Sequence, residues 1–429
     1  MVCVVSGYDR ERMSFRSDLL STSGVTIGIA LGNVLVFGLA VRQLGDIGFA
    51  EYALGRRVLA VALPAAMIGI GVSLPRYIAM TNSPRHRNRL LVRAVVWLSL
   101  SNGAVWALGI AFRSQLAASL FGSSEATRLL MGVGIALAGG CAHAVAYGYL
   151  RGVLHILPAN ALNLIALGGV PVLAVTVANA GTSSVFVIQG ISLLVLAGFV
   201  LVPVILTNAR SFDELNEPVA PLISYGIRRV PGDLALMALL SAPSILAVAL
   251  YGVEIAGMVA FGTTLVTLAG TALSPLSTLL LPYLASARGE PKTLAAYRRG
   301  SRTAVGWLVG SGVLFCSGFG LLSEQIVGAY LGASYASVAY IAAIMVWGGI
   351  GYGVHVALRS IVDAIEFRAV NSASALVALS LCVLWSAGVA TANANVSALL
   401  VGFVAAVTAL GAQTWWHARR VLASGQSSQ

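Results

Sequence analysis

Long apolar stretches alternate with short polar segments along the whole chain. A helix needs about 20 mostly apolar residues to cross about 30 Å of hydrocarbon, and about twelve stretches reach that length. The predicted spans are residues 19–41, 55–80, 94–112, 129–149, 159–180, 185–208, 232–250, 255–284, 303–322, 338–358, 371–391 and 395–416. The second and the eighth are long enough to tilt or to extend beyond the bilayer. The pattern therefore predicts an all-α integral membrane protein.

Composition supports a membrane protein and argues against several other classes. Of the 429 residues, 58% are hydrophobic and 10% are charged, which is far more apolar than a soluble domain. The net charge of +11 lies in short loops, where it is explained by membrane orientation, so we expect no nucleic-acid partner. The four cysteines are scattered; we therefore expect neither a disulfide framework nor a metal or cofactor site.

The distribution of basic residues predicts an orientation. With the N-terminus inside, roughly twenty Lys and Arg residues fall on the cytoplasmic side and about five on the other. The strongest contributions come from the segments 85–93 and 288–302. The first span has no small-residue cleavage site behind a short apolar region, so we expect no signal peptide. We predict a multi-pass protein of the cell membrane with both termini in the cytoplasm.

The two halves of the chain repeat one another. The segment Leu74–Ala79 returns at Leu281–Ala285, and the Leu-Arg pair at 150–151, followed by Asn163, returns at 358–359, followed by Asn371. Because each half holds an even number of spans, the repeat is parallel, about an axis along the membrane normal. Binding sites of duplicated membrane proteins usually lie between the two halves, so the repeat indicates transport.

The repeat divides the chain into lobes. We expect a cytoplasmic N-terminus at 1–18, a first lobe of six helices at 19–208, a connector at 209–221, a second lobe at 222–416 and a cytoplasmic tail at 417–429. No predicted loop is longer than about 25 residues, which leaves no room for a soluble catalytic domain.

Ionisable residues at membrane depth are costly, so each is a functional candidate. Arg56 and Arg57 stand at the predicted outer start of the second span. Two interpretations remain open: their side chains reach up to the interface, or at least one points between the lobes and binds an anionic substrate group. Arg76, at the inner end of the same span, is an interfacial anchor or a phosphate contact at the inner opening.

A second group of polar residues marks the junction of the lobes. Arg228 and Arg229 are placed to attract a diphosphate head group, although positive-inside topology also explains them. Asp233 follows Pro231 at the start of the seventh span, which is an ordinary helix start. Asn160 and Asn163 are candidates to hydrogen-bond a sugar, but such residues more often join helices. We count Asp233, Asn160 and Asn163, together with Asn33 of the first span, as possible lining residues of the cavity.

Enzymatic chemistry has little support in the sequence. Glycosyl transfer or hydrolysis requires converging acids, bases or metal ligands, and the spans hold no His/Asp/Glu cluster and no Ser or Cys with a suitable base. An ATP-driven pump is also disfavoured because the chain has no phosphate-binding glycine loop. We therefore predict that the protein is not an enzyme and has no catalytic residue.

The residues resemble a known family. The segment from Leu44 through Phe49 and Tyr52 to Ala79 is similar to the first outer loop and second helix of Wzx-type polysaccharide biosynthesis proteins. These proteins belong to the multidrug/oligosaccharidyl-lipid/polysaccharide (MOP) exporter superfamily. Tyr225–Asp233 resembles the start of that family's second lobe, and Leu358–Ala364 with Asn371 resembles its tenth-to-eleventh helix turn. The resemblance spans nearly the whole chain, through short motifs that describe a fold more than a substrate.

The resemblance implies a MATE-like fold of twelve helices in two pseudo-symmetric six-helix lobes, with alternating access. It implies export of a polyprenyl-(di)phosphate-linked oligosaccharide to the outer leaflet, for surface polysaccharide or glycoprotein assembly. Membrane lipids and glycan-assembly enzymes are the other implied partners. The family's cationic cavity suits Arg56, Arg57, Arg228 and Arg229. This chain departs from the family in its first span, which holds no Arg or Lys and only one strongly polar residue, Asn33.

Three functions compete at this point. A flippase for lipid-linked oligosaccharide is the first, and a cation-coupled multidrug antiporter of the same superfamily is the second. An antiporter needs membrane carboxylates; the first span has none, although Asp46, Asp233 or Glu254 remain available. A membrane-embedded glycosyltransferase is the third, and the missing carboxylate cluster counts against it. A lipid II flippase would carry two further helices, which this length does not supply.

Overall fold

The computed structural model describes residues 2–81, 83–179, 181–207, 226–227, 230–286, 291–365, 370–392 and 395–424. Helices follow one another throughout these ranges, with no strand. The first lobe contains α1 (Val2–Met67), α2 (Ile70–Ala79), α3 (Pro84–Ala111), α4 (Arg113–Phe121), α5 (Thr127–Gly152), α6 (Ile156–Leu164), η1 (Ile165–Gly169), α7 (Val170–Val177) and α8 (Thr182–Thr207). The second contains α10 (Val230–Tyr251), α11 (Val253–Ser286), α12 (Pro291–Leu321), α13 (Ser323–Leu331), η3 (Ala333–Val338), α14 (Ala339–Met345), α15 (Gly348–Ile365), α16 (Val370–Thr391) and α17 (Val396–Ser424).

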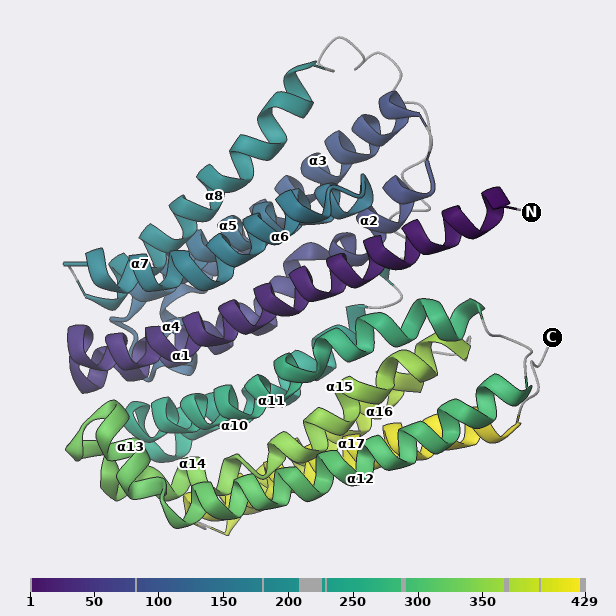
Figure 1. Ribbon diagram of the computed structural model, residues 1–429. Coiled ribbons are helices and arrows are strands. Elements are labelled where there is room, and N and C mark those ends of the chain that lie inside the picture. Colours follow the sequence, from purple (N-terminus) through teal and green to yellow (C-terminus); the bar gives the residue numbers. More distant parts are fainter. Residues whose placement is uncertain are drawn as a thin grey trace.

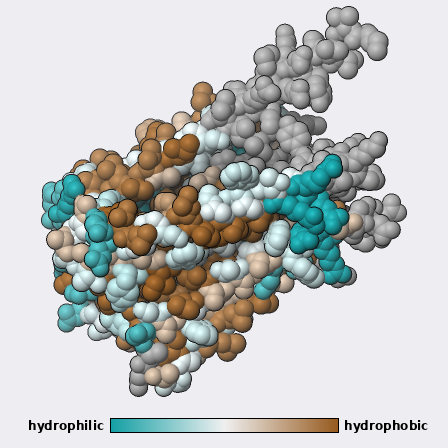
Figure 2. All heavy atoms as spheres, turned by 60° about the horizontal axis from the view of Figure 1, so that its bottom comes forward, coloured by the Kyte–Doolittle hydropathy of each residue, from teal (hydrophilic) through white to brown (hydrophobic). Residues whose placement is uncertain are grey.

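Ten of the described helices are long and apolar enough to cross a membrane, or eleven if the bent pair α14–α15 forms one span. One of the ten, Ser21–Met67, is two spans joined at a kink, so the prediction of about twelve spans is confirmed. Figure 2 shows a broad band of hydrophobic residues between hydrophilic clusters near the two ends of the molecule. The protein is a multi-pass membrane protein.

The kink lies at Gly45, whose backbone is non-helical (φ 70°, ψ −176°). Phe37 packs edge-on against both Phe49 and Tyr52, so the chain doubles back at this single residue. Glycine suits the position because a positive φ strains any residue with a Cβ. The sequence prediction of an outer loop before a span starting at 55 was wrong: the second helix resumes directly after Gly45.

The second half repeats this geometry. Gly252, 207 positions after Gly45, also has a positive φ (85°) and separates α10 from α11. The short helices α4 and α13 correspond as well, and each ends at a positive-φ glycine, Gly122 or Gly332. The internal repeat is therefore present in the backbone as well as in the sequence.

The two lobes lie side by side, with α1, α10 and α11 at the seam (Figure 1). They lie together at the end that carries α4 and α13, and diverge toward the end that carries both termini (Figure 1). Following the orientation predicted from the sequence, we call these the outer end and the inner end. The largest buried cluster of apolar side chains crosses the seam and includes Phe37, Tyr52, Leu239, Phe261 and Phe403.

Candidate functional site

Arg56 and Arg57 lie deep in the fold. They follow Gly45 by 11 and 12 positions, which is about 16–18 Å along the helix. This distance brings them near the middle of a hydrocarbon layer of about 30 Å. Arg57 is only 6% exposed and Arg56 is partly buried. Because the helix resumes earlier than predicted, the two arginines stand well inside it rather than at its outer start.

Arg56 is held within the first lobe by both arms of the α1 hairpin. Its Nη2 donates a hydrogen bond to the amide oxygen of Asn33, while the amide nitrogen of Asn33 bonds the carbonyl of Ile29. Its guanidinium lies 5.1 Å from the ring centre of Phe37 and 5.9 Å from that of Tyr52, at cation–π distances. The one strongly polar residue of the first span therefore orients an arginine of the second.

Arg57 points across the seam to the second lobe. Its Nη2 donates to the hydroxyl of Thr264 on α11 at 2.7 Å. That hydroxyl in turn donates to the carbonyl of Ala260 at 3.0 Å, which fixes it as an acceptor for the arginine. The backbone carbonyl of Arg57 accepts a bond of 3.2 Å from Ser241 on α10. One arginine thus joins three helices of the two lobes.

The charges of the two arginines are incompletely satisfied. Among the described residues, their side-chain partners are neutral: an amide, a hydroxyl and two aromatic rings. Nη1 of Arg56 and Nε of Arg57 are buried without a hydrogen-bond partner. Buried cations are costly unless they are paired. The pair is therefore suited to bind an anion that brings both charge and acceptor oxygens.

Aromatic side chains fill the seam on the outer side of the arginines. Phe49 packs edge-on against Tyr335, with ring centres 5.4 Å apart. Phe37 and Phe261 meet across the lobes at 5.7 Å, and Phe261 lies 6.1 Å from Tyr330. We call these five residues the outer aromatic cluster. It closes the seam between the arginines and the outer end.

A hydroxyl group reinforces this closure. Tyr330 on α13 donates to the carbonyl of Val34 and accepts a bond of 3.0 Å from the backbone nitrogen of Gly38. In a regular helix the backbone nitrogen of Gly38 bonds the carbonyl of Val34. Here the hydroxyl of Tyr330 bonds both groups.

Sequence reasoning missed Tyr330 and Thr264. The repeat offset of 207 positions was a signal for Thr264, because it pairs that residue with Arg57.

The other predicted site residues that the structure describes lie on α2, α6 and α10. Asn160 is buried on α6 and bonds the hydroxyls of Ser21 and Thr22 at 3.0 and 3.3 Å, so it joins two helices. Asn163 is half-buried on the same helix. Arg76 is exposed in the last turn of α2.

At the start of the second lobe, Asp233 is exposed in the first turn of α10. Arg228 and Arg229 lie outside the described residues. The repeated motif of the second lobe has a structural role: the Asn371 side chain bonds the carbonyl of Arg359 at 3.0 Å and the carboxylate of Asp363 at 2.9 Å. It ties α16 to α15. Of the predicted site residues within the described ranges, Asn33, Arg56 and Arg57 come together.

Acidic and metal-binding chemistry is sparse where the structure describes the chain. No three His, Cys, Asp or Glu side chains are placed to hold a metal ion in those ranges. Asp46 and Glu254 are exposed, next to the turns at Gly45 and Gly252. Asp46 precedes Arg56 by ten positions on α1, and Glu254 precedes Thr264, the partner of Arg57, by ten positions on α11.

Comparison with known proteins shows the fold. No protein-family model and no curated protein matches the sequence. The structure is similar to an inward-facing multidrug resistance MATE family transporter of the MOP superfamily: the TM-score is 0.74 at 14% identity, covering 95% of this chain and 100% of that one. It is similar to the lipid II flippase MurJ in an inward closed conformation, with a TM-score of 0.68 at 14% identity, covering 92% and 86%.

An outward-facing MATE family transporter gives a lower TM-score of 0.61, at 12% identity over 96% of this chain and 97% of that one. The higher value for an inward-facing structure agrees with the closure at the outer aromatic cluster and with lobes that diverge toward the inner end (Figure 1). These neighbours are transporters and flippases rather than enzymes. The chain therefore has the fold of the transporters of the MOP superfamily.

Proposed function

We propose that this protein is a flippase that moves a polyprenyl-(di)phosphate-linked oligosaccharide from the cytoplasmic to the outer leaflet. One observation carries the proposal: Arg56 and Arg57 lie side by side near mid-membrane depth with neutral partners and unpaired nitrogens. Such a pair offers positive charge and free donors to a phosphate group. The polyprenyl chain stays in apolar surroundings while the head group crosses between the lobes.

The contacts of Arg57 suggest how binding is coupled to movement. In the present conformation its guanidinium is bonded to Thr264 of the opposite lobe. A phosphate oxygen is a stronger acceptor than a hydroxyl, because bonds between ionised groups are shorter and stronger. When the head group binds, it replaces Thr264 and releases a contact that holds the lobes together. The lobes, 1–208 and 222–429, then rock about the site, as in other transporters with two like halves.

Asn33 has a distinct role in this proposal. Its amide holds one nitrogen of Arg56 and leaves Nη1 of that residue without a partner. The first span therefore supplies an orienting group rather than a charge. Arg228, Arg229 and Arg76, together with Asn160, Asn163 and Asp233, remain proposals as contacts along the route of the head group. Membrane lipids and glycan-assembly enzymes remain proposed partners, in a cell membrane with both termini cytoplasmic.

A cation-coupled multidrug antiporter is the second candidate. The TM-score of 0.74 with a multidrug MATE transporter favours it as strongly as the flippase neighbour favours the first proposal. The positive charge of the arginine pair argues for the flippase, because it repels cationic drugs. A glycosyltransferase has no comparable support in the site.

The test is the sidedness of lipid-linked oligosaccharide in cells that lack the protein. A membrane-impermeant glycan probe is applied to intact cells and to inverted vesicles. We expect the glycan to accumulate on the cytoplasmic face and to return to the outer face when the gene is restored. Normal sidedness, together with a changed sensitivity to cationic dyes, would overturn the flippase proposal in favour of the antiporter.

A further inference from the structure

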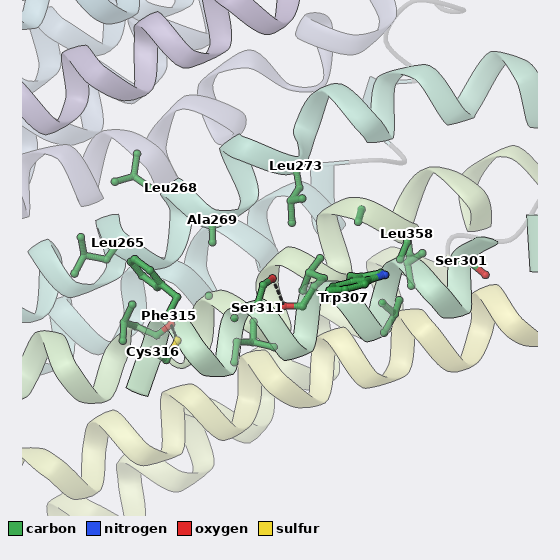
Figure 3. A pocket seen from close by; sticks show the side chains of 18 of the residues that line it. Leu265, Leu268, Ala269, Leu273, Ser301, Trp307, Ser311, Phe315, Cys316 and Leu358 are labelled. Carbon is green, nitrogen blue, oxygen red and sulfur yellow. Dashed lines mark hydrogen bonds between the residues drawn. The ribbon is translucent and has the colours of Figure 1, made fainter. Parts of the chain in front are cut away.

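The second lobe contains a large apolar groove away from the arginine pair. It has a volume of about 1270 Å³ and lies between α11, α12 and α15 (Figure 3). Helix α11 contributes Leu265, Leu268, Ala269 and Leu273 to the lining, and the side chain of Leu273 points toward α12 (Figure 3). Trp307 and Phe315 belong to α12 and are mostly exposed, at 75% and 64%. On a membrane span, side chains exposed in this way must be covered by hydrocarbon.

The dimensions of the groove limit what can occupy it. Pockets for drug-sized ligands are about 300–1000 Å³, so this groove is larger than most of them. Its lining on α12 extends from Gly300 to Phe319, which is about 28 Å along the helix. That length approaches the full hydrocarbon thickness of about 30 Å. A phospholipid tail reaches only through its own leaflet, about half of this distance, so filling the groove takes either tails from both leaflets or one longer apolar chain.

The inner end of the groove is basic. Its last lining residues there are Gly300 and Ser301 on α12 and Ile361 on α15. Arg299 and Arg302 flank the first two in sequence, and Arg359 lies between Leu358 and Ile361, which both line the groove; all three arginines are exposed. Among the described residues that line the groove, none is charged. An apolar channel with cations at one end is complementary to a long hydrocarbon chain that ends in phosphate.

We propose that this groove is a loading site for the polyprenyl chain of a polyprenyl (di)phosphate, with the phosphate at Arg299, Arg302 and Arg359. That this lipid is the transported substrate rests on the proposed function; the binding itself does not. Helix α11 connects the two sites, because Thr264 contacts Arg57 on one side of the helix and Leu265 lines the groove on another. The head group moves from the basic end of the groove to the arginine pair while the chain remains on α11.

The binding test uses the full-length protein in phosphatidylcholine vesicles. One probe is a polyprenyl diphosphate with a diazirine midway along the chain, and the other is a phospholipid with the same group in its tail. We expect the polyprenyl probe to label the groove faces of α11, α12 and α15, and excess unlabelled phospholipid to leave that labelling unchanged. Equal labelling of the groove by the phospholipid probe would overturn the proposal, because ordinary bilayer lipid would then fill it.

Two kinds of variant make the test specific. Ser311 lines the groove, whereas Ser317 is exposed on the same helix and does not line it. Ser311→Phe should block the groove and reduce labelling by about tenfold, whereas Ser317→Phe should not. Replacing Arg299 and Arg302 by Gln should also reduce labelling about tenfold, because each loses a charged hydrogen bond. Ala304→Phe serves as a second blocking variant if Ser311→Phe is poorly expressed.

The sidedness assay separates this inference from the proposed function. If wild-type protein flips the glycan and the blocked variants flip it equally well, the groove is not a loading site and the flippase proposal stands. If the groove is labelled specifically but cells lacking the protein show normal sidedness, the groove binds the lipid and the flippase proposal fails. Loss of both labelling and flipping in Ser311→Phe, but not in Ser317→Phe, supports both.

Discussion

Arg57 and Thr264 occupy equivalent positions in the two halves of the chain, 207 residues apart, and are joined by a hydrogen bond of 2.7 Å. The same offset relates the two kink glycines, Gly45 and Gly252. Equivalent residues of two like units can touch only close to the axis that relates them. The bond therefore lies close to the pseudo-symmetry axis between the two lobes.

The arginine pair should be required for transport. Replacing Arg56 and Arg57 together by Gln removes two charges and the donors proposed to bind the head group. We expect transport to fall by about tenfold or more for each residue, because a charged hydrogen bond is lost at each. The measurement is glycan sidedness at matched expression. The double Lys variant keeps the charge without the planar fork and should retain partial transport; full transport by the Gln variant would contradict the proposal.

Thr264 should control the balance between conformations. Thr264→Val leaves Nη2 of Arg57 without its acceptor, which costs about 1–3 kcal/mol in the conformation closed at the outer end. Thr263→Val is a matched control, since Thr263 is buried next to it and, in the described part of the chain, bonds the carbonyl of Val259 within its own helix. We expect a lower thermal midpoint for Thr264→Val than for Thr263→Val. Equal midpoints would show that the bond across the seam adds no stability.

The Tyr330 hydroxyl should keep the outer end closed. Tyr330→Phe removes both of its bonds to α1 and preserves the ring in the outer aromatic cluster. A reporter cysteine at Ala50 suits the measurement, because Ala50 is 2% exposed and packs against Gly257 of the other lobe. Labelling of this cysteine by an impermeant maleimide should rise in Tyr330→Phe. Tyr340→Phe, at an exposed position, is the control and should leave the labelling unchanged. Unchanged labelling in Tyr330→Phe would show that the two bonds do not keep the outer end closed.

Gly69 should tolerate no side chain. Its φ is 77°, and a Cβ there would lie 2.3–2.4 Å from backbone atoms of Gly226 in the second lobe. Gly69→Ala should cost at least about 1–2 kcal/mol from the backbone conformation alone and should also force the lobes apart. Gly71→Ala is the control, because its Cβ would meet only the end of Met67 at 3.4 Å. Thermal unfolding in detergent compares the two; similar midpoints would contradict the close approach.

Some features followed from the sequence alone. A run of about 20 apolar residues has few alternatives to a membrane helix, so the spans could be predicted one by one. The repeat was visible because Leu74 and Leu281, or Asn163 and Asn371, stand at nearly one offset. Two roles were considered for Asn160, a sugar contact and a bond between helices. The second needed only local reasoning, since polar residues in spans commonly join helices.

Other features depended on the tertiary structure. The depth of Arg56 and Arg57 depended on whether residues 44–55 form a loop or a helix, which the conformation of Gly45 decides. Thr264 and Asn33 are partners of the arginines, and Tyr330 is a partner of the α1 backbone. They come from helices that are distant in sequence or folded back, and packing brings them to these contacts. The groove exists because α12 stands apart from α11 (Figure 3). The length of an apolar stretch is enough to predict a membrane helix, because the backbone groups of each span are satisfied by hydrogen bonds within that span. It does not specify which helices touch.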